Sequence, residues 1–228
     1  MLRSANKAFT LIELLVVIGI LGLLTTVLIV SFGGVFSSSS NSDTELRIET
    51  LKSGIERFQT NYQYLPFASL YALSTKGQFN TEGSVMDKNN TNKGIEALVM
   101  ALRTRNEGGP FITNDFLLEY QCNTDNDEIA QNMTNVEGAL KLFEISDAWD
   151  NPFVYVNLAE LTVNDYAVPL SVMTSDGTPQ QVDLNELKQK LLDPETKLQV
   201  AKGWCIWSFG EDGLNDYGRG DDVTSWPK

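Results

Sequence analysis

The sequence predicts an α+β fold in which a long N-terminal helix packs on a small sheet, with loops and short helices inserted. Three observations predict it. Residues 14–42 form an uncharged and mostly apolar run, apolar side chains repeat at helical spacing over 48–62, and β-prone segments follow at 153–156 and 203–208. Apolar residues at steps of three and four indicate an amphipathic helix, whereas short β-branched and aromatic runs are typical of strands.

The composition excludes several classes of function. The chain has 228 residues, 42% of them apolar, so it can bury a core and form one domain or two small ones. Its net charge of −13 argues against nucleic acid as a partner, because phosphates would repel it. The absence of histidine excludes histidine triads and histidine-ligated metals. With no nucleophile-elbow or paired-carboxylate pattern either, we do not expect an enzyme.

The uncharged run predicts a membrane segment. About 20 apolar residues in a helix cross the ~30 Å hydrocarbon layer, and a buried core helix of this length and uniformity is the less favoured alternative. An ordinary signal peptide is also less favoured, because no small-x-small cleavage site follows the run. Glu13 lies at the head of this helix. Since a carboxylate in hydrocarbon costs roughly 2.5 kcal/mol or more, we expect it to have a partner, or else to lie at the interface.

The residues around this glutamate, from Lys7 onwards, read KAFTLIELLVVIGILGLL. They closely resemble the type IV prepilin signature, which type IV pilins share with the pseudopilins of type II secretion. The resemblance implies that a prepilin peptidase cuts between Ala8 and Phe9, methylates the new amino terminus and leaves the apolar helix in place. The family usually has glycine where this chain has Ala8. The resemblance also implies that Glu13 pairs with the amino terminus of a neighbouring subunit during filament assembly.

These features predict a leader over residues 1–8, a transmembrane and filament-core helix over 9–36, and a periplasmic globular pilin-like domain over 37–228. The segment 33–40 is rich in glycine and serine, which disfavour helix. We expect it to be either a softened stretch that lets the helix bend or a plain linker.

Helical spacing resumes over residues 43–65. The apolar residues of one face are Ile48, Leu51, Ile55, Phe58 and Tyr62. We interpret this stripe as the surface that packs on the sheet, and a partner-binding stripe is the less favoured alternative. The helix should end near Leu65, because the residue before Pro66 disfavours the α conformation. The segment also resembles the end of the long helix in major pseudopilins.

The middle of the chain contains a short predicted helix over 94–102 and an acidic turn over 123–127. The turn has oxygen-bearing residues at the first, third and fifth positions of a candidate calcium loop. However, Glu128 replaces the glycine of the sixth position and Thr134 the glutamate of the twelfth. We therefore favour a solvated acidic loop over a metal site here.

Residues 147–152 have turn chemistry, and 153–156 have strong β propensity. This stretch resembles the one that opens the small antiparallel sheet of major pseudopilins, with Ala148 and Asp150 as departures, and so implies an antiparallel sheet here. Residues 158–200 look like an insertion within that sheet and include a predicted helix over 183–192.

After the β-prone segment at 203–208, the C-terminal loop carries five carboxylates within residues 211–222. These charges repel each other unless they are solvated or neutralised, and calcium takes 6–8 oxygen ligands from carboxylates and carbonyls. The segment resembles the calcium loop of major pseudopilins, although the spacer within it is longer here. The resemblance implies that calcium is a cofactor. Its candidate ligands are Asp212, Asp221 and Asp222, with Asp216 as a further candidate.

The two cysteines, Cys122 and Cys205, could form a disulfide after export or remain as two buried thiols. The leading functional interpretation is a pseudopilin of a type II secretion system, anchored in the inner membrane by a single span. The resemblance implies a homo-oligomeric filament, other pseudopilins, a prepilin peptidase and an inner-membrane assembly platform as partners. The alternatives are a type IV pilus subunit on the cell surface and a membrane-anchored binding protein or enzyme that never assembles.

Overall fold

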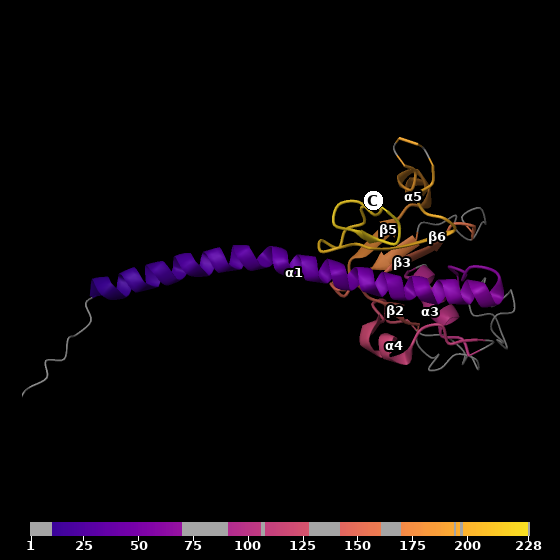
Figure 1. The fold of residues 1–228 in the computed structure, drawn as a ribbon, viewed down its shortest axis with the longest axis horizontal. Helices are drawn as coiled ribbons and strands as arrows, with labels where there is room; N and C mark the ends of the chain where they lie inside the picture. Colours follow the sequence, from indigo (N-terminus) through magenta and orange to yellow (C-terminus); the bar gives the residue numbers. More distant parts are fainter. Residues whose placement is uncertain are drawn as a thin grey trace, which may run out of the picture. The chain divides into compact units, whose positions relative to one another are not determined.

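The computed structural model describes residues 11–69, 91–105, 108–127, 142–160, 170–193, 195–196 and 198–227, with only the backbone for 28–37. The predicted cleavage site at Ala8 and Phe9 lies outside these residues. The helices are α1 (Leu11–Tyr62), α3 (Lys93–Leu102), α4 (Asn114–Tyr120) and α5 (Leu184–Lys190) (Figure 1). The strands are β1 (Gln121–Cys122), β2 (Glu144–Ile145), β3 (Val154–Asn157), β4 (Leu170–Met173), β5 (Pro179–Val182), β6 (Trp204–Ser208) and β7 (Val223–Thr224).

The chain divides into two compact units, residues 1–40 and 41–228. In the first unit, the large apolar side chains of α1 between Leu11 and Val27 are exposed, and Glu13 lies in the first turn. Within the described part of the chain, no helix is long and apolar enough to cross a membrane. The structure therefore does not show the span predicted over 9–36.

Residues 33–40 are helical within α1, so the plain linker considered there is wrong, and the bending of this stretch within a filament stays a prediction. Continuing the helix through this segment costs less free energy than ending it and starting a second helix. Gly33 and Gly34 each disfavour the helix by up to about 1 kcal/mol. Starting a second helix after a break has a nucleation constant of about 10⁻³, which corresponds to roughly 4 kcal/mol.

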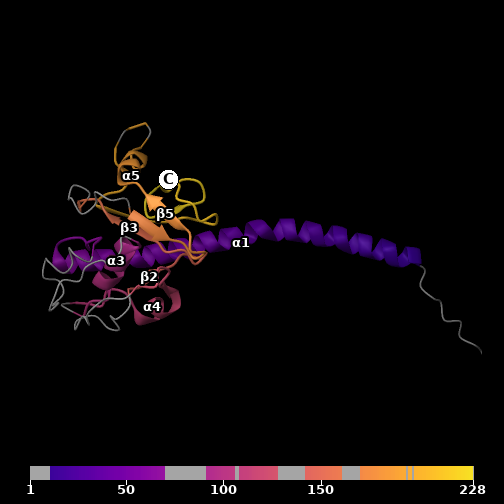
Figure 2. The same cartoon turned by 180° about the vertical axis from the view of Figure 1, so that it is seen from behind.

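In the second unit, α1 buries the face that the sequence predicts. Ile48, Leu51, Ile55 and Phe58 are at most 2% exposed, and Tyr62 is half-buried against the same core, so the packing interpretation is confirmed. The helix ends at Tyr62, shortly before the predicted end near residue 65, and Gln63 follows with a φ of 62°. In Figures 1 and 2, strands β3 and β5 lie on one side of this part of α1 and α4 lies on the other.

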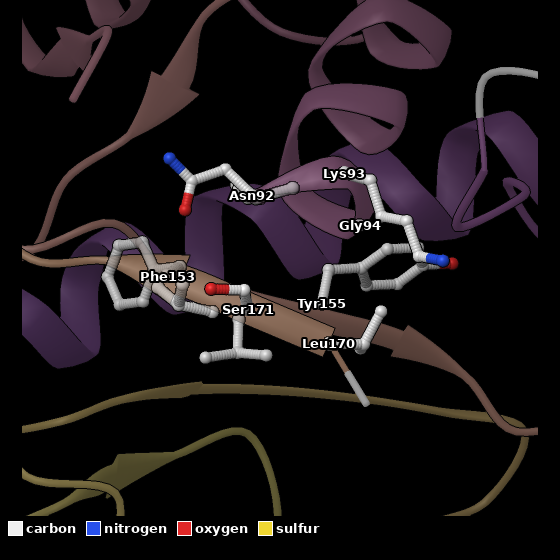
Figure 3. A pocket seen from close by; sticks show the side chains of 10 residues that line it. Asn92, Lys93, Gly94, Phe153, Tyr155, Leu170 and Ser171 are labelled. Atoms are coloured by element: carbon white, nitrogen blue, oxygen red, sulfur yellow. The ribbon is translucent and has the colours of Figure 1, made fainter. Parts of the chain in front are cut away.

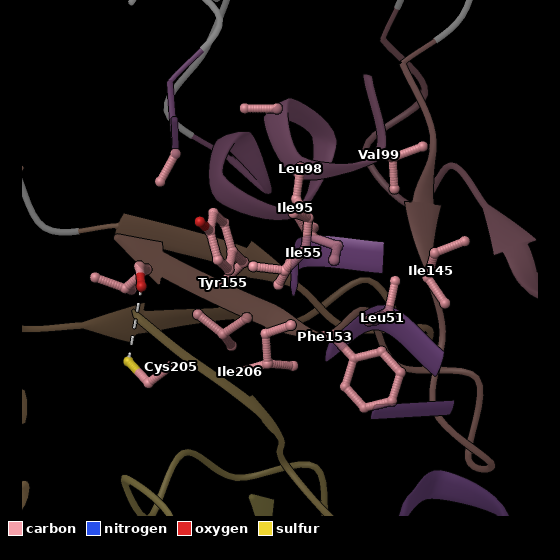
Figure 4. Close-up of a cluster of buried hydrophobic side chains, with 14 of the residues drawn as sticks. Leu51, Ile55, Ile95, Leu98, Val99, Ile145, Phe153, Tyr155, Cys205 and Ile206 are labelled. Atoms are coloured by element: carbon pink, nitrogen blue, oxygen red, sulfur yellow. Dashed lines mark hydrogen bonds between the residues drawn. The ribbon is translucent and has the colours of Figure 1, made fainter. Parts of the chain in front are cut away.

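Helix α3 is buried along its whole length, which confirms the helix predicted over 94–102. A helix that is apolar on nearly all sides is typical of a protein interior. Its first turn lies directly on β3, because a Cβ atom on Gly94 would be 2.2 Å from the carbonyl oxygen of Tyr155. Figure 4 shows Ile95 of α3 and Ile55 of α1 meeting Tyr155 in the core.

Strands β3, β6 and β7 form an antiparallel sheet in that order. Val154 pairs with Trp207, and Trp207 pairs in turn with Thr224 on β7. The strands predicted at 153–156 and 203–208, and their antiparallel arrangement, are therefore confirmed. Two smaller antiparallel pairs, β1 with β2 and β4 with β5, complete the described strands.

The predicted insertion over 158–200 contains β4, β5 and α5. Helix α5 confirms the helix predicted over 183–192, although it is shorter. The Asp183 carboxylate caps it by accepting hydrogen bonds from the N–H groups of Asn185 and Glu186. Such a cap satisfies backbone donors that have no partner within the helix.

Candidate functional site

The acidic C-terminal loop connects β6 to β7, and the pairing of these two strands closes it at the base. Two glycines allow its close turns. A Cβ on Gly210 would be 2.6 Å from a carboxylate oxygen of Asp221, and one on Gly220 would be 2.7 Å from a carboxylate oxygen of Asp216. Both glycines have positive φ, a conformation that other residues rarely adopt, so the loop backbone can approach its own carboxylates closely.

Three carboxylates of this loop lie together: Asp212, Asp216 and Asp221 each offer an oxygen within 4.8 Å of the others. Calcium–oxygen distances of about 2.3–2.6 Å place two ligands of one ion at most about 5 Å apart, so this spacing fits one calcium ion. The N–H of Asp212 donates to Asp221 Oδ2 (3.0 Å), and the N–H of Leu214 donates to Asp212 Oδ1 (2.8 Å). These bonds orient the carboxylates and leave other lone pairs for a cation.

The structure groups Asp216, rather than Asp222, with Asp212 and Asp221. Asp222 is buried, and its Oδ2 accepts a hydrogen bond from the N–H of Gly218 (2.7 Å). Its Oδ1 accepts none from the described residues. Burial raises the pKa of Asp222 to about 7, the Gly218 bond opposes this, and the charges of Asp216 and Asp221 raise it further.

Side chains outside the loop hold it in place. Asn215 Oδ1 accepts a hydrogen bond from Trp207 Nε1 (3.2 Å), and its Nδ2 donates to the carbonyl of Gln181 on β5 (3.1 Å). The Tyr217 hydroxyl accepts from the N–H of Asp183 at the start of α5 (3.1 Å). The loop is therefore fixed against both β6 and the inserted β4–β5 region.

The turn at 147–152 anchors the start of the loop, and Asp147 is its centre. The buried Asp147 carboxylate accepts hydrogen bonds from the N–H groups of Trp149 and Asn151 (both 2.9 Å) and from the Ser208 hydroxyl. Ser208 Oγ in turn accepts from the N–H of Gly210 (3.0 Å). Burial raises the pKa of Asp147, although these hydrogen bonds lower it.

The same turn is bound to α1. Arg47 Nη1 donates to the carbonyl oxygens of Ser146 (2.9 Å) and Asp147 (2.7 Å). The N–H of Ala148 donates to Thr44 Oγ1 (3.1 Å). Sequence reasoning identified this turn from its composition but gave no sign that it connects the helix to the acidic loop.

A second acidic cluster is formed by residues of α3, β2 and the turn after β1. Glu96 of α3, Asp125 of the turn after β1 and Glu144 of β2 each offer an oxygen within 4.8 Å of the others. Burial raises the pKa of Glu144 to about 7, the hydrogen bond from Asn92 opposes this, and the charges of Asp125 and Asp127 add to the rise. The solvated loop expected at 123–127 is thus half-buried. Sequence reasoning missed Glu96 and Glu144.

Both cysteines are free thiols in the structure, so the disulfide considered from the sequence is not present. Cys205 is buried on β6, where its Sγ lies 4.0 Å from the carbonyl oxygen of Val156. Cys122 is half-buried on β1. Burial raises the pKa of both thiols, and the charge of Glu144 raises that of Cys122 further.

Residues 3–29 match the prokaryotic N-terminal methylation motif, which is typical of type IV pilin-like proteins. The matched segment contains Ala8, Phe9 and Glu13, and it indicates a substrate of a prepilin peptidase. The prepilin-like character predicted from the sequence is confirmed at this level. The motif points to a structural protein and not to an enzyme. No curated protein and no solved structure matches the chain.

Proposed function

We propose that this chain is a pseudopilin, a structural subunit of the periplasmic filament of a type II protein secretion system. The methylation motif supports the pilin-like part of the proposal. The acidic loop between β6 and β7 carries the finer part, because its sequence resembles the calcium loop of major pseudopilins. Three of its carboxylates lie together, although Asp216 stands where the resemblance gave Asp222. A type IV pilus subunit on the cell surface is the alternative, since it would carry the same motif.

In this role, the N-terminal segment that carries the methylation motif anchors the subunit in the inner membrane and later packs among the same segments of other subunits. Two opposite charges buried together cost far less than either one alone. Glu13 of one subunit therefore pairs with the methylated amino terminus of Phe9 in a neighbour, and this pair sets the register of assembly. The globular residues 41–228 lie in the periplasm.

The acidic loop takes calcium as a structural cofactor. Asp212, Asp216 and Asp221 are its side-chain ligands, and carbonyl oxygens of the loop complete the shell. A bound calcium ion supplies the positive charge that compensates for these carboxylates. The hydrogen bonds of Ser208 at the start of the loop and of Asn215 in its middle hold the loop backbone, so that the carboxylates meet at one point.

Processing and assembly can be tested with the full chain in a host that has a prepilin peptidase. Mass spectrometry should find a mature chain that begins at N-methylated Phe9. In a strain that lacks its own copy of the gene, the wild type should restore protein secretion, whereas Glu13→Leu should insert in the membrane but fail to restore it. The matched variant Glu56→Gln, which alters an exposed carboxylate on α1, should behave like the wild type.

Each other outcome of this experiment has a definite meaning. An intact Met1 terminus, or a cut after the apolar run, would contradict the prepilin-like processing. Restoration of surface filaments without restoration of secretion would replace the pseudopilin with the pilus subunit. Full activity of Glu13→Leu would refute the pairing of Glu13 with a neighbouring amino terminus.

Calcium binding can be tested by thermal unfolding of the full chain in detergent. A ligand that binds only the folded state at a hundredfold excess over Kd stabilises it by about 2.7 kcal/mol, which raises Tm by roughly 5–10 °C for a chain of this size. Asp221→Asn should reduce the rise, whereas Asp115→Asn, an exposed carboxylate on α4, should not. Magnesium should act poorly, because it requires a tighter octahedral shell. Equal Tm values in calcium and in chelator would refute the site.

A further inference from the structure

The buried acidic cluster of Glu96, Asp125 and Glu144 is built from three elements that are distant in the sequence. Glu96 lies on α3, Asp125 in the turn after β1, and Glu144 on β2, and their offered oxygens lie within 4.8 Å of one another. Glu96 is 2% exposed and Glu144 is fully buried. Water therefore cannot solvate these carboxylates as it solvates Asp212 and Asp216 in the C-terminal loop.

Glu144 gives the observation that points to a ligand. Its Oε1 accepts a hydrogen bond from Asn92 Nδ2 (2.6 Å), and its buried Oε2 accepts none from the described residues, although the Cys122 thiol, a weak donor, lies beside the carboxylate. The charges that act on it most strongly are those of Asp125 and Asp127, which are also negative. A buried carboxylate oxygen is costly unless a donor or a cation faces it, so this oxygen is suited to a positive ion.

Asn92 holds the cluster in a fixed geometry. It has a φ of 53°, and Figure 3 shows its side chain just before α3, extending away from Tyr155 and Leu170. Besides Glu144, its Nδ2 donates to Thr124 Oγ1 (2.8 Å), and its Oδ1 accepts from the N–H of Met173 on β4 (2.9 Å). The Asn92 amide thus orients Glu144 and binds Thr124, the residue before Asp125. It is itself held by the N–H of Met173 on β4. Outer contacts of this kind orient the ligands of metal sites.

We infer that Glu96, Asp125 and Glu144 bind a calcium ion, independently of the proposed filament role. All three ligands are carboxylates, which suit hard cations, and the 4.8 Å limit on their spacing fits calcium–oxygen distances of about 2.3–2.6 Å. Magnesium fits less well, because it requires a near-ideal octahedron with metal–oxygen distances of about 2.0–2.1 Å, which would hold the oxygens closer together. The ion would link α3 to the β1–β2 pair.

Counting bound calcium tests this inference apart from the C-terminal loop. The full chain is purified in detergent, stripped with chelator, dialysed against calcium chloride and analysed for calcium per chain. A variant with both Asp216→Asn and Asp221→Asn, which disables the loop cluster, should still bind one ion. Adding Glu144→Gln should remove that ion or weaken its binding at least about tenfold, as loss of a ligand or its support typically does. Adding Glu56→Gln instead should change nothing.

Circular dichroism of each variant shows whether it is folded. If Glu144→Gln does not fold, Asp125→Asn decides, because Asp125 is only half-buried. The inference is overturned if the Asp216→Asn/Asp221→Asn variant binds no calcium, or if neither Glu144→Gln nor Asp125→Asn changes its binding. If the chain binds a single ion that is lost only with Asp216→Asn/Asp221→Asn, the loop site exists and the Glu144 site does not. If it binds a single ion that is lost only with Glu144→Gln, the Glu144 site exists and the loop site does not.

Discussion

Replacing Asp147 with alanine should destabilise the globular unit more than most single substitutions. The carboxylate is fully buried and accepts hydrogen bonds from the N–H groups of Trp149 and Asn151 and from the Ser208 hydroxyl. Alanine has no acceptor, so all three donors would lose their partner. A buried donor left without a partner costs about 1–3 kcal/mol, and allowing for relaxation we expect a loss of about 3–5 kcal/mol. The total free energy of unfolding of a typical domain is only about 5–15 kcal/mol.

Asp147→Asn separates the hydrogen bonds from the charge. The asparagine amide oxygen can accept from both backbone N–H groups, and its NH₂ can donate to Ser208 Oγ. Burial raises the pKa of Asp147, so the ionised wild type loses stability as the pH rises through that pKa. Asparagine cannot ionise and avoids this loss. We therefore expect Asp147→Asn to lie within about 1 kcal/mol of the wild type at pH 7.

Urea unfolding of the full chain in detergent, followed by tryptophan fluorescence, measures both variants. Equal losses for Asp147→Ala and Asp147→Asn would show that the charge, and not the acceptor geometry, matters at this site. A loss below about 1 kcal/mol for Asp147→Ala would refute the reasoning, because three donors left without an acceptor, two of them in buried hydrogen bonds, must cost more than one surface hydrogen bond.

Two other predictions concern the core and the thiols. Gly94→Ala should lower the free energy of unfolding by about 3 kcal/mol in the same assay, because its Cβ would overlap the Tyr155 carbonyl. The control Gly19→Ala should leave this transition unchanged, because no atom lies within 4 Å of the added Cβ. Equal effects of the two variants would contradict the close approach of α3 to β3. Cys122 and Cys205 should resist iodoacetamide at pH 8 in the folded chain, because burial raises both pKa values, and should both react in urea without reductant. Mass spectrometry counts the adducts, and no adducts in urea would reveal a disulfide.

Elements with a strong local pattern were predictable from the sequence. The stripe from Ile48 to Phe58, the apolar helix α3 and strands β3 and β6 each carry their own periodicity or propensity. Strand β5 (Pro179–Val182) does not, since it is polar and mostly exposed, and its pairing with β4 creates the element. The continuation of α1 through 33–40 depends on the cost of a new helix start, which residue preferences alone do not express.

The acidic loop was predictable in place but not in detail. Asp221 and Asp222 are neighbours in the turn just before β7, outside any strand, so no periodicity in the sequence tells which of them faces inward. In the structure Asp222 turns inward to Gly218 while Asp221 faces its cluster, and Asp216 takes the third place. Glu96 and Glu144 gave no signal, because each lies among apolar neighbours within a helix or a strand. Tertiary packing alone brings them to Asp125.

The geometry of the acidic loop depends on residues far from it in the sequence. Arg47 on α1 donates to the carbonyl of Asp147, the Asp147 carboxylate accepts from Ser208, and Ser208 accepts from Gly210 at the start of the loop. A substitution that removes any of these hydrogen bonds should therefore alter the loop geometry without changing an acidic ligand. Because Ser208→Ala removes the middle step and keeps every carboxylate, it should weaken calcium binding by the loop while the loop's net charge stays the same. An unchanged affinity would mean that strand pairing between β6 and β7 fixes the loop by itself.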